Sequence, residues 1–163
     1  MFRRILDAVD RRDFDAASSA LLDIDDERQR KAALSATNAA GSTLLSVAAT
    51  KPNAGELIRL LVRLGADVNS RNDASLTPLH QAALGGHLDN VKSLLELGAD
   101  PTARNTVGNS SLMCAALVGA AEVADALLAA GVDPTLLNDR GTSSCAASMP
   151  LFGFLSALSC LSP

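Results

Sequence analysis

Residues 77–100 read TPLHQAALGGHLDNVKSLLELGAD and contain the signals of two consecutive helices. Thr77 is a residue type that caps the free amide groups at a helix start, and Pro78 suits the first helical position. The apolar residues within 91–95 share one face at helical spacing. Gly98 stands where a helix commonly ends in the left-handed conformation, which glycine tolerates best. The stretch therefore predicts a helix, a turn, a second helix and a glycine stop.

The same pattern recurs along the chain. A Gly-Ala-Asp or Gly-Val-Asp triplet begins at Gly65, Gly98 and Gly131, which gives a period of about 33 residues. The segments 43–49 and 110–116 repeat the start of the first helix, and each ends in a pair of alanines. One such unit cannot bury its own apolar face. The units must therefore stack, and stability becomes a sum of contacts between neighbours.

These residues and their period resemble those of ankyrin-repeat proteins, and the resemblance extends over roughly residues 37–161. It implies an all-α fold, an ankyrin-repeat α-solenoid of stacked helix-turn-helix units joined by hairpin loops. The organisation that we expect is a degenerate repeat of N-terminal capping helices at 1–36, ankyrin repeats at 37–70, 71–103 and 104–136, and a degenerate C-terminal ankyrin repeat at 137–163.

Three features depart from the family pattern. Only the unit at 77–80 has the complete Thr-Pro-Leu-His segment, whose histidine is implied by the resemblance to steady the turn through local hydrogen bonds. Ser75 stands where a glycine is expected. The residue that opens each hairpin is asparagine in place of the usual aspartate, at Asn38, Asn72, Asn105 and Asn138. From the first departure we expect weaker individual repeats and no change of fold.

Charge is unevenly distributed along the chain. The segment 1–36 is rich in charges of both signs, which suits a terminal unit with a polar outer face, although the run 23–31 could instead be a solvated linker. After Arg140 no residue is charged. The large apolar residues of this last part are Leu151, Phe152, Phe154, Leu155 and Leu158. This apolar surface could be covered in three ways, by a further repeat in a longer protein, by self-association through this apolar helix, or by contact with a membrane. Pro150 and Gly153 interrupt the run, so we expect no membrane-spanning helix.

The composition argues against several classes of function. The net charge of −4 provides no basic field for a phosphate backbone, so we expect no nucleic-acid partner. Aromatic residues make up 2% of the chain, with no Trp and no Tyr, which argues against an aromatic platform for bases or sugars. The 3 cysteines are odd in number and far apart, and we recognise no secretory signal. We therefore expect an intracellular protein, in the cytoplasm or the nucleus.

Catalytic and metal-binding motifs are scarce. His80 and His87 have no Cys, Asp or Glu at a metal-ligand spacing on the same helix. Cys114, Cys145 and Cys160 have no sequence-local histidine, and a buried cysteine usually acts as a small hydrophobe. A stand-alone hydrolase would lack a nucleophile–base pair. We expect no enzyme, no cofactor, no metal and no small-molecule substrate.

The most specific expectation concerns protein recognition. The resemblance implies that the hairpin tips and the exposed face of the first helices bind partner proteins, and a solenoid offers a concave surface for this purpose. We predict a non-catalytic scaffold, adaptor or regulatory module that binds a partner protein or peptide with an apolar segment. Arg71 and Arg104, on adjacent hairpins, are placed to receive a nearby carboxylate. The predicted binding residues are Ser70, Arg71, Asp73, Leu76, Gln81, Leu84, Arg104, Val107, Asn109, Cys114, Leu117, Leu137 and Arg140.

Two further interpretations stay open at this point. The chain could be a regulatory or targeting segment of a larger enzyme or membrane-associated protein, with its apolar C-terminal end covered by the remainder or by self-association. Asn69 lies in a context that resembles the asparagines hydroxylated in ankyrin repeats, whereas an asparagine that only pins the turn is the simpler interpretation.

Overall fold

The computed structural model describes residues 2–143, and this part of the chain consists of helices joined by loops. The helices are α1 (Phe2–Asp10), α2 (Phe14–Leu22), α3 (Glu27–Ser35), α4 (Leu44–Ala49), α5 (Gly55–Arg63), α6 (Pro78–Leu84), α7 (Leu88–Glu96), α8 (Ser111–Val118) and α9 (Ala121–Ala129). Strand-like pairing in residues 2–143 is limited to isolated antiparallel bridges within loops, such as the bridge between Arg104 and Ser110. The apolar segment at 151–158, Cys145 and Cys160 lie outside the described residues, as does most of the expected repeat at 137–163.

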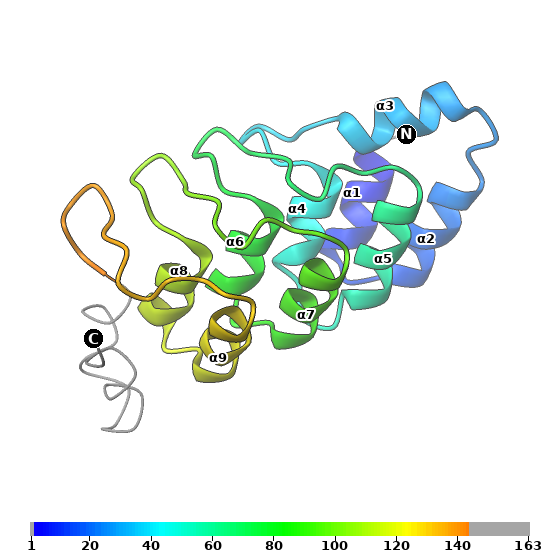
Figure 1. Cartoon of the computed structure of the whole chain (residues 1–163). Helices are drawn as coiled ribbons and strands as arrows, with labels where there is room; N and C mark the ends of the chain where they lie inside the picture. The colour runs from blue at the N-terminus through cyan, green and yellow to red at the C-terminus, as the bar shows by residue number, and fades with distance from the viewer. Residues whose placement is uncertain (1, 144–163) are drawn as a thin grey trace.

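The helices stack in two layers, as Figure 1 shows. One layer holds the first helices of the units, α4, α6 and α8, and each packs against the next. The other layer holds the second helices, α5, α7 and α9, which also contact one another in order. The long loops between units lie side by side along one edge of the molecule, and the short turns within units lie along the opposite edge. The all-α stack of helix-turn-helix units predicted from the sequence is confirmed.

The core runs through the stack because equivalent apolar residues are buried in every unit. Leu61, Leu94 and Leu127, one from each second helix, are 0% exposed. Each of these leucines stabilises the fold by roughly 2 kcal/mol through its removal from water. Ala82 and Ala115 of the first helices are also 0% exposed, and their small side chains let these helices approach closely. Burial is therefore shared between neighbouring units.

The start of α6 is held by a reciprocal pair of hydrogen bonds. The Thr77 hydroxyl accepts the His80 amide at 3.5 Å, and Nδ1 of His80 accepts the Thr77 amide at 3.3 Å. Nε2 of His80 then donates to the carbonyl of Asn109 in the next unit at 3.0 Å. The local role expected for this histidine is confirmed, and the same ring also ties two units together.

The asparagine that opens each hairpin holds the turn with its side-chain oxygen. Oδ1 of Asn72 accepts the amides of Ala74 at 3.0 Å and of Leu76 at 2.9 Å. The same pair of bonds recurs at Asn38, Asn105 and Asn138. Nδ2 of Asn72 reaches back to the preceding hairpin and donates to the Ser42 hydroxyl at 3.4 Å. An aspartate could accept the same two amides but could not donate this further bond.

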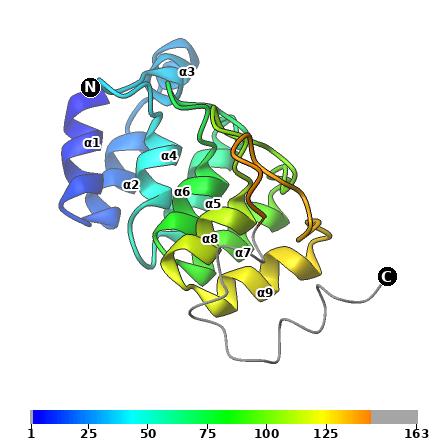
Figure 2. The same ribbon diagram turned by 90° about the vertical axis from the view of Figure 1, so that its left-hand side faces the viewer.

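The charged segment near the N-terminus contains a helix. α3 begins after Asp26, whose carboxylate accepts the Arg28 amide at 2.8 Å, and it buries Ala33 and Leu34. The alternative of a solvated linker at 23–31 is therefore wrong from residue 27 onward, because the apolar residues that follow the charged run hold this helix against α4. α3 lies at the edge that carries the long loops (Figures 1 and 2). Below it, α1 packs against α4 and α2 packs against α5.

Candidate partner-binding face

The predicted binding residues belong to two neighbouring surfaces. We call the hairpins at 38–42, 72–76, 105–109 and 138–142 the fingers. The recognition face then comprises the fingers, the residue that precedes each of them, and the exposed side of α4, α6 and α8. Figures 1 and 2 show the fingers following one another along the stack.

Two arginines link successive fingers. Nη1 of Arg71 donates to the backbone carbonyl of Arg104 at 2.9 Å, across 33 residues of sequence. Arg104 repeats the contact one unit further on, where its Nη2 donates to the carbonyl of Leu137. Its Nε also donates to the carbonyl of Gly108 at 3.0 Å. The two guanidinium groups therefore lie on adjacent fingers, as their equivalent positions predict, and both are fixed by backbone oxygens.

Hydrogen bonds between backbone groups also link successive fingers. The Asp73 amide donates to the Ala40 carbonyl at 3.3 Å, and the Thr106 amide donates to the Ala74 carbonyl at 3.1 Å. The Asp139 amide continues the series. Each finger is thus joined to the next near its tip, so the side chains at the tips are presented by a connected edge.

The helical part of the recognition face is mainly apolar. Leu117, at the end of α8, is 58% exposed, whereas Leu84 at the equivalent position of α6 is half-buried. Val118 is 48% exposed beside Leu117, and the sequence analysis missed it. The sequence did contain a signal for Val118. It follows Leu117 directly, and the equivalent position in the preceding unit is Gly85, the residue after α6. Val107 on the third finger and Leu137 just before the fourth are 39% and 56% exposed.

Cys114 does not belong to the exposed surface. Its side chain is 2% exposed and packs within the hydrophobic core, whereas Val47 and Gln81 at the equivalent positions are half-buried. The expectation that Cys114 lines the face is wrong because its short, apolar thiol is enclosed by neighbouring core residues. Burial raises the pKa of Cys114 to about 12, so the thiol stays protonated at neutral pH.

The other predicted residues differ in how freely they face solvent. Gln81 and Leu76 are half-buried, and Asp73 and Arg140 are exposed. The remaining two are also half-buried and take part in hydrogen bonds between side chains. The Ser70 hydroxyl lies 3.1 Å from that of Thr43, and Oδ1 of Asn109 accepts Nδ2 of Asn138 at 2.7 Å. Their role in binding stays a prediction.

Asn69 is engaged by the unit that follows it. Its Oδ1 accepts the Asp100 amide at 2.8 Å, and its Nδ2 donates to the Gly98 carbonyl at 3.4 Å. Both atoms of the side-chain amide therefore hold neighbouring units together, which supports the pinning interpretation. Hydroxylation of Asn69 stays a prediction.

The two histidines have structural partners. Burial lowers the pKa of His80, and the positive charge of Arg71 acts in the same direction, while the Asn109 carbonyl opposes it. Nε2 of His87 donates to the Thr50 carbonyl at 3.0 Å. Within residues 2–143 no group of three or more His, Cys, Asp or Glu side chains is arranged to hold a metal ion.

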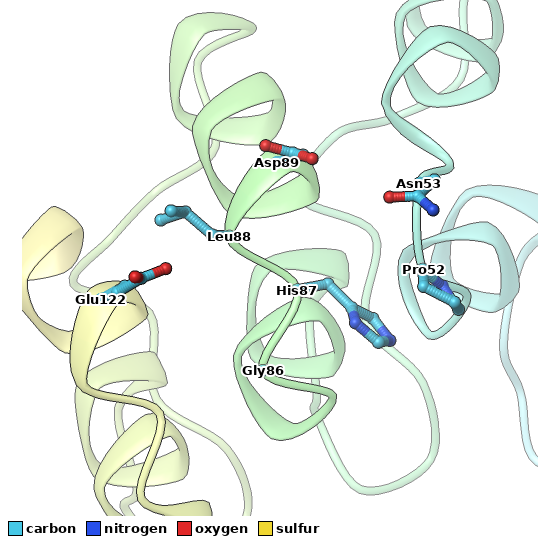
Figure 3. A pocket seen from close by; sticks show the side chains of 7 residues that line it. All are labelled: Pro52, Asn53, Gly86, His87, Leu88, Asp89 and Glu122. Atoms are coloured by element: carbon cyan, nitrogen blue, oxygen red, sulfur yellow. The ribbon is translucent and has the colours of Figure 1, made fainter.

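A shallow hollow of about 270 Å³ lies at the opposite edge, among the turns within units (Figure 3). Its lining consists of Pro52, Asn53, Gly86, His87, Leu88, Asp89 and Glu122. The His87 ring turns toward Pro52, while Leu88 and Glu122 point toward one another. This lining contains no Ser, Cys, Thr or Lys that could act as a nucleophile beside the histidine.

None of the helices between residues 2 and 143 has the length and apolar character needed to cross a membrane.

Comparison with known proteins agrees with the stacked units. The family model described as "Ankyrin repeats (3 copies)" matches residues 8–105 and 45–138, which together extend over most of the chain. A stretch of 51 residues is 45% identical to Ankyrin repeat domain-containing protein 49 of Mus musculus. The match covers 31% of this chain and 21% of the mouse protein, so the shared part is about a fifth of that relative's length.

Proposed function

Because this chain belongs to the ankyrin-repeat family, whose members generally act as protein–protein interaction modules, we propose that it binds a partner protein or peptide on its recognition face. In this proposal the recognition face is the concave side that a solenoid of stacked repeats offers to a partner. The function is non-catalytic, as a scaffold, adaptor or regulatory module, and it consists of presenting a fixed surface to the partner.

One observation supports this choice of face above the others. Leu117 and Val118 expose apolar surface at the end of α8, in the layer of first helices that the fingers with their fixed arginines precede. Contiguous exposed apolar surface is a feature of protein interaction sites. The chemistry of the described residues is consistent with binding, since the thiol of Cys114 is buried and protonated and the hollow at the opposite edge has no Ser, Cys, Thr or Lys beside its histidine.

Site-specific photocrosslinking tests the proposal in extracts of the source cells. A photoreactive amino acid is placed at Leu117 or Val107 on the recognition face, and at Arg63 or Asp125 on the second helices as matched exposed controls. We expect one partner protein to crosslink from the first two positions and not from the controls. Crosslinking of the same partner only from the second helices would overturn the choice of face.

A further inference from the structure

We infer that the partner segment is acidic and amphipathic, so that its carboxylates bond to Arg71 and Arg104 while its apolar side chains cover Leu117 and Val118. This inference rests on the proposed function and specifies the chemistry of the partner. It is carried by the distribution of charge, by the state of the two arginines and by the position of the apolar residues.

The recognition face differs in charge from the rest of the molecule. The chain has a net charge of −4, yet α4, α6 and α8 contain no acidic and no basic residue other than the buried His80. The charged side chains of the fingers and of the residues that precede them are Arg71, Asp73, Arg104, Asp139 and Arg140. Basic groups therefore outnumber acidic ones on this face of an acidic protein. Such a face attracts a segment with negative charge and steers its approach.

Acidic side chains lie at both edges, with Asp67, Asp100 and Asp133 in the long loops before the fingers and three others in the turns at the opposite edge. Glu56, Asp89 and Glu122 occupy the first turns of α5, α7 and α9, where they lie close to the positive ends of the helix dipoles. Asp89 and Glu122 also line the hollow of Figure 3. The lining of that hollow has no Lys or Arg, so an acidic partner segment is repelled there.

Neither Arg71 nor Arg104 forms a salt bridge within residues 2–143, although Arg71 has one carboxylate nearby, since its charge adds to the Thr102 hydrogen bonds that lower the pKa of Asp100. Lys51 pairs with Asp10 at 2.9 Å and Arg59 pairs with Glu96 at 2.7 Å, whereas no carboxylate pairs with either finger arginine in the described part of the chain. Their acceptors are neutral backbone carbonyls. These bonds fix the guanidinium groups and leave further N–H donors facing solvent. A carboxylate of a partner can then bind with little additional loss of side-chain freedom.

The repeat sets the spacing that the partner must match. Arg71 and Arg104 occupy the same position in neighbouring units and make the same contact with the next finger. Their guanidinium groups are therefore separated by about the distance between packed helices, roughly 8–10 Å. An extended segment advances about 3.3 Å per residue, so acidic residues about three positions apart fit the pair, whereas adjacent ones do not.

The apolar contacts lie toward the C-terminal end of the face. Leu117 and Val118 stand in the columns that Thr50 and Lys51 occupy in the first unit. Val107 on the third finger and Leu137 just before the fourth add exposed apolar surface near the same end. Apolar side chains of the partner are thus expected over α8, with its acidic residues toward Arg71.

Selection from a random peptide library displayed on phage tests this inference with the full chain. Enriched peptides are synthesised, and their affinity is measured for the wild type, for Arg71→Gln/Arg104→Gln and for Leu117→Ser/Val118→Ser. Arg63→Gln and Leu22→Ser serve as matched controls, since each replaces an exposed residue of the same type away from the recognition face. Circular dichroism verifies that every variant is folded.

We expect the enriched peptides to combine apolar residues with acidic residues about three positions apart. Each double variant should weaken binding by roughly tenfold or more, and the controls should leave it unchanged. Peptides that lack acidic residues and lose affinity only in Leu117→Ser/Val118→Ser would overturn the inference and leave the proposed function intact. Peptides insensitive to both double variants would overturn both. If no peptide is enriched above the bare support, the inference fails, and the photocrosslinking experiment then decides the proposed function alone.

Discussion

The carboxylate of Asp139 lies directly over Gly108 of the preceding finger, so that a Cβ added to Gly108 would be 2.5 Å from Oδ1 of Asp139. Asp73 lies over Gly41 in the same way, so that a Cβ added to Gly41 would also clash with the carboxylate. The intermediate pair of fingers differs at both positions, because Ser75 replaces the glycine and Thr106 replaces the aspartate. Where the turn of one finger has a side chain, as at Ser75, the next finger therefore has no carboxylate at the position that would lie over it.

Gly108→Ala should lower the free energy of unfolding by about 2–4 kcal/mol, because it adds a steric clash to the strain of a left-handed residue. Gly108 has a φ of +75°, and the Asp139 amide nitrogen also lies 2.9 Å from the position of the added carbon. Gly98 is the control, since its φ is +88° and its added Cβ would meet nothing within 4 Å. For Gly98→Ala we expect about 1–2 kcal/mol.

Urea denaturation of both variants measures the difference. Equal losses for the two alanines would show that the contact with Asp139 has no energetic weight. The double variant Gly108→Ala/Asp139→Ser should recover part of the excess, and only part, because the backbone nitrogen stays in place.

Ser75→Gly should stabilise the protein by about 1 kcal/mol, because Ser75 holds a left-handed conformation that costs an L-residue about 1–2 kcal/mol, partly offset by the greater freedom of glycine in the unfolded chain. Its φ is +56°, close to that of the glycines at the equivalent turns. An antiparallel bridge closes the hairpins at 37–43, 104–110 and 137–143, whereas Arg71 and Thr77 form none. Thermal unfolding followed by circular dichroism measures the change. Ser70→Gly, at a residue with no positive φ, should destabilise instead, and a loss of stability in both variants would contradict this account.

Stability should decrease as the pH falls below about 6.5, because folding lowers the pKa of His80. The unfolded chain then binds a proton at a higher pH than the folded chain does. Neutral His80 therefore contributes fully to the free energy of unfolding above the ordinary pKa of 6.5, and this contribution is lost as the pH falls toward the lowered pKa of the folded chain. Chemical denaturation between pH 5 and 8 measures this slope. His80→Gln removes the titrating ring and should flatten the profile relative to the wild type. An unchanged slope would show that His80 does not cause it.

The sequence could predict the units because their signals are local and repeated. A hydroxyl residue such as Thr77 begins a helix and a glycine such as Gly98 ends one, and the period then places the units against one another. Contacts between units were harder to predict. Cys114 and Gln81 occupy equivalent positions of neighbouring units, yet Cys114 is buried and Gln81 is half-buried. The position in the repeat alone does not predict this difference.

The state of the arginines also depended on tertiary structure. Equivalent positions predicted that Arg71 and Arg104 lie on adjacent fingers, but not that each donates to a carbonyl 33 residues further along the chain. α3 was uncertain for the same reason. Four of its nine residues are charged, and its contact with α4 accounts for the burial of Ala33 and Leu34.

Asn90→Ala should lower the free energy of unfolding by about 2–4 kcal/mol, because it removes the partner of three backbone groups in the preceding unit. Asn90 is 0% exposed. Its Oδ1 accepts the Ala54 amide at 3.1 Å, and its Nδ2 donates to the carbonyls of Ala49 at 3.2 Å and Lys51 at 2.7 Å. Asp89→Ala, at the neighbouring exposed residue, should change stability by no more than about 0.5 kcal/mol.

The effect of Asn90 should also be confined to one boundary between units. In the next unit the equivalent residue is Val123, which is 1% exposed and has no polar side-chain atom to bond the turn before it. Hydrogen exchange of Asn90→Ala should therefore show faster exchange at the Ala54 amide, while amides of α8 and α9 keep their protection. Uniform loss of protection along residues 2–143 would instead mean that the units unfold only together, and that this side chain acts on the whole stack rather than on the boundary between α5 and α7.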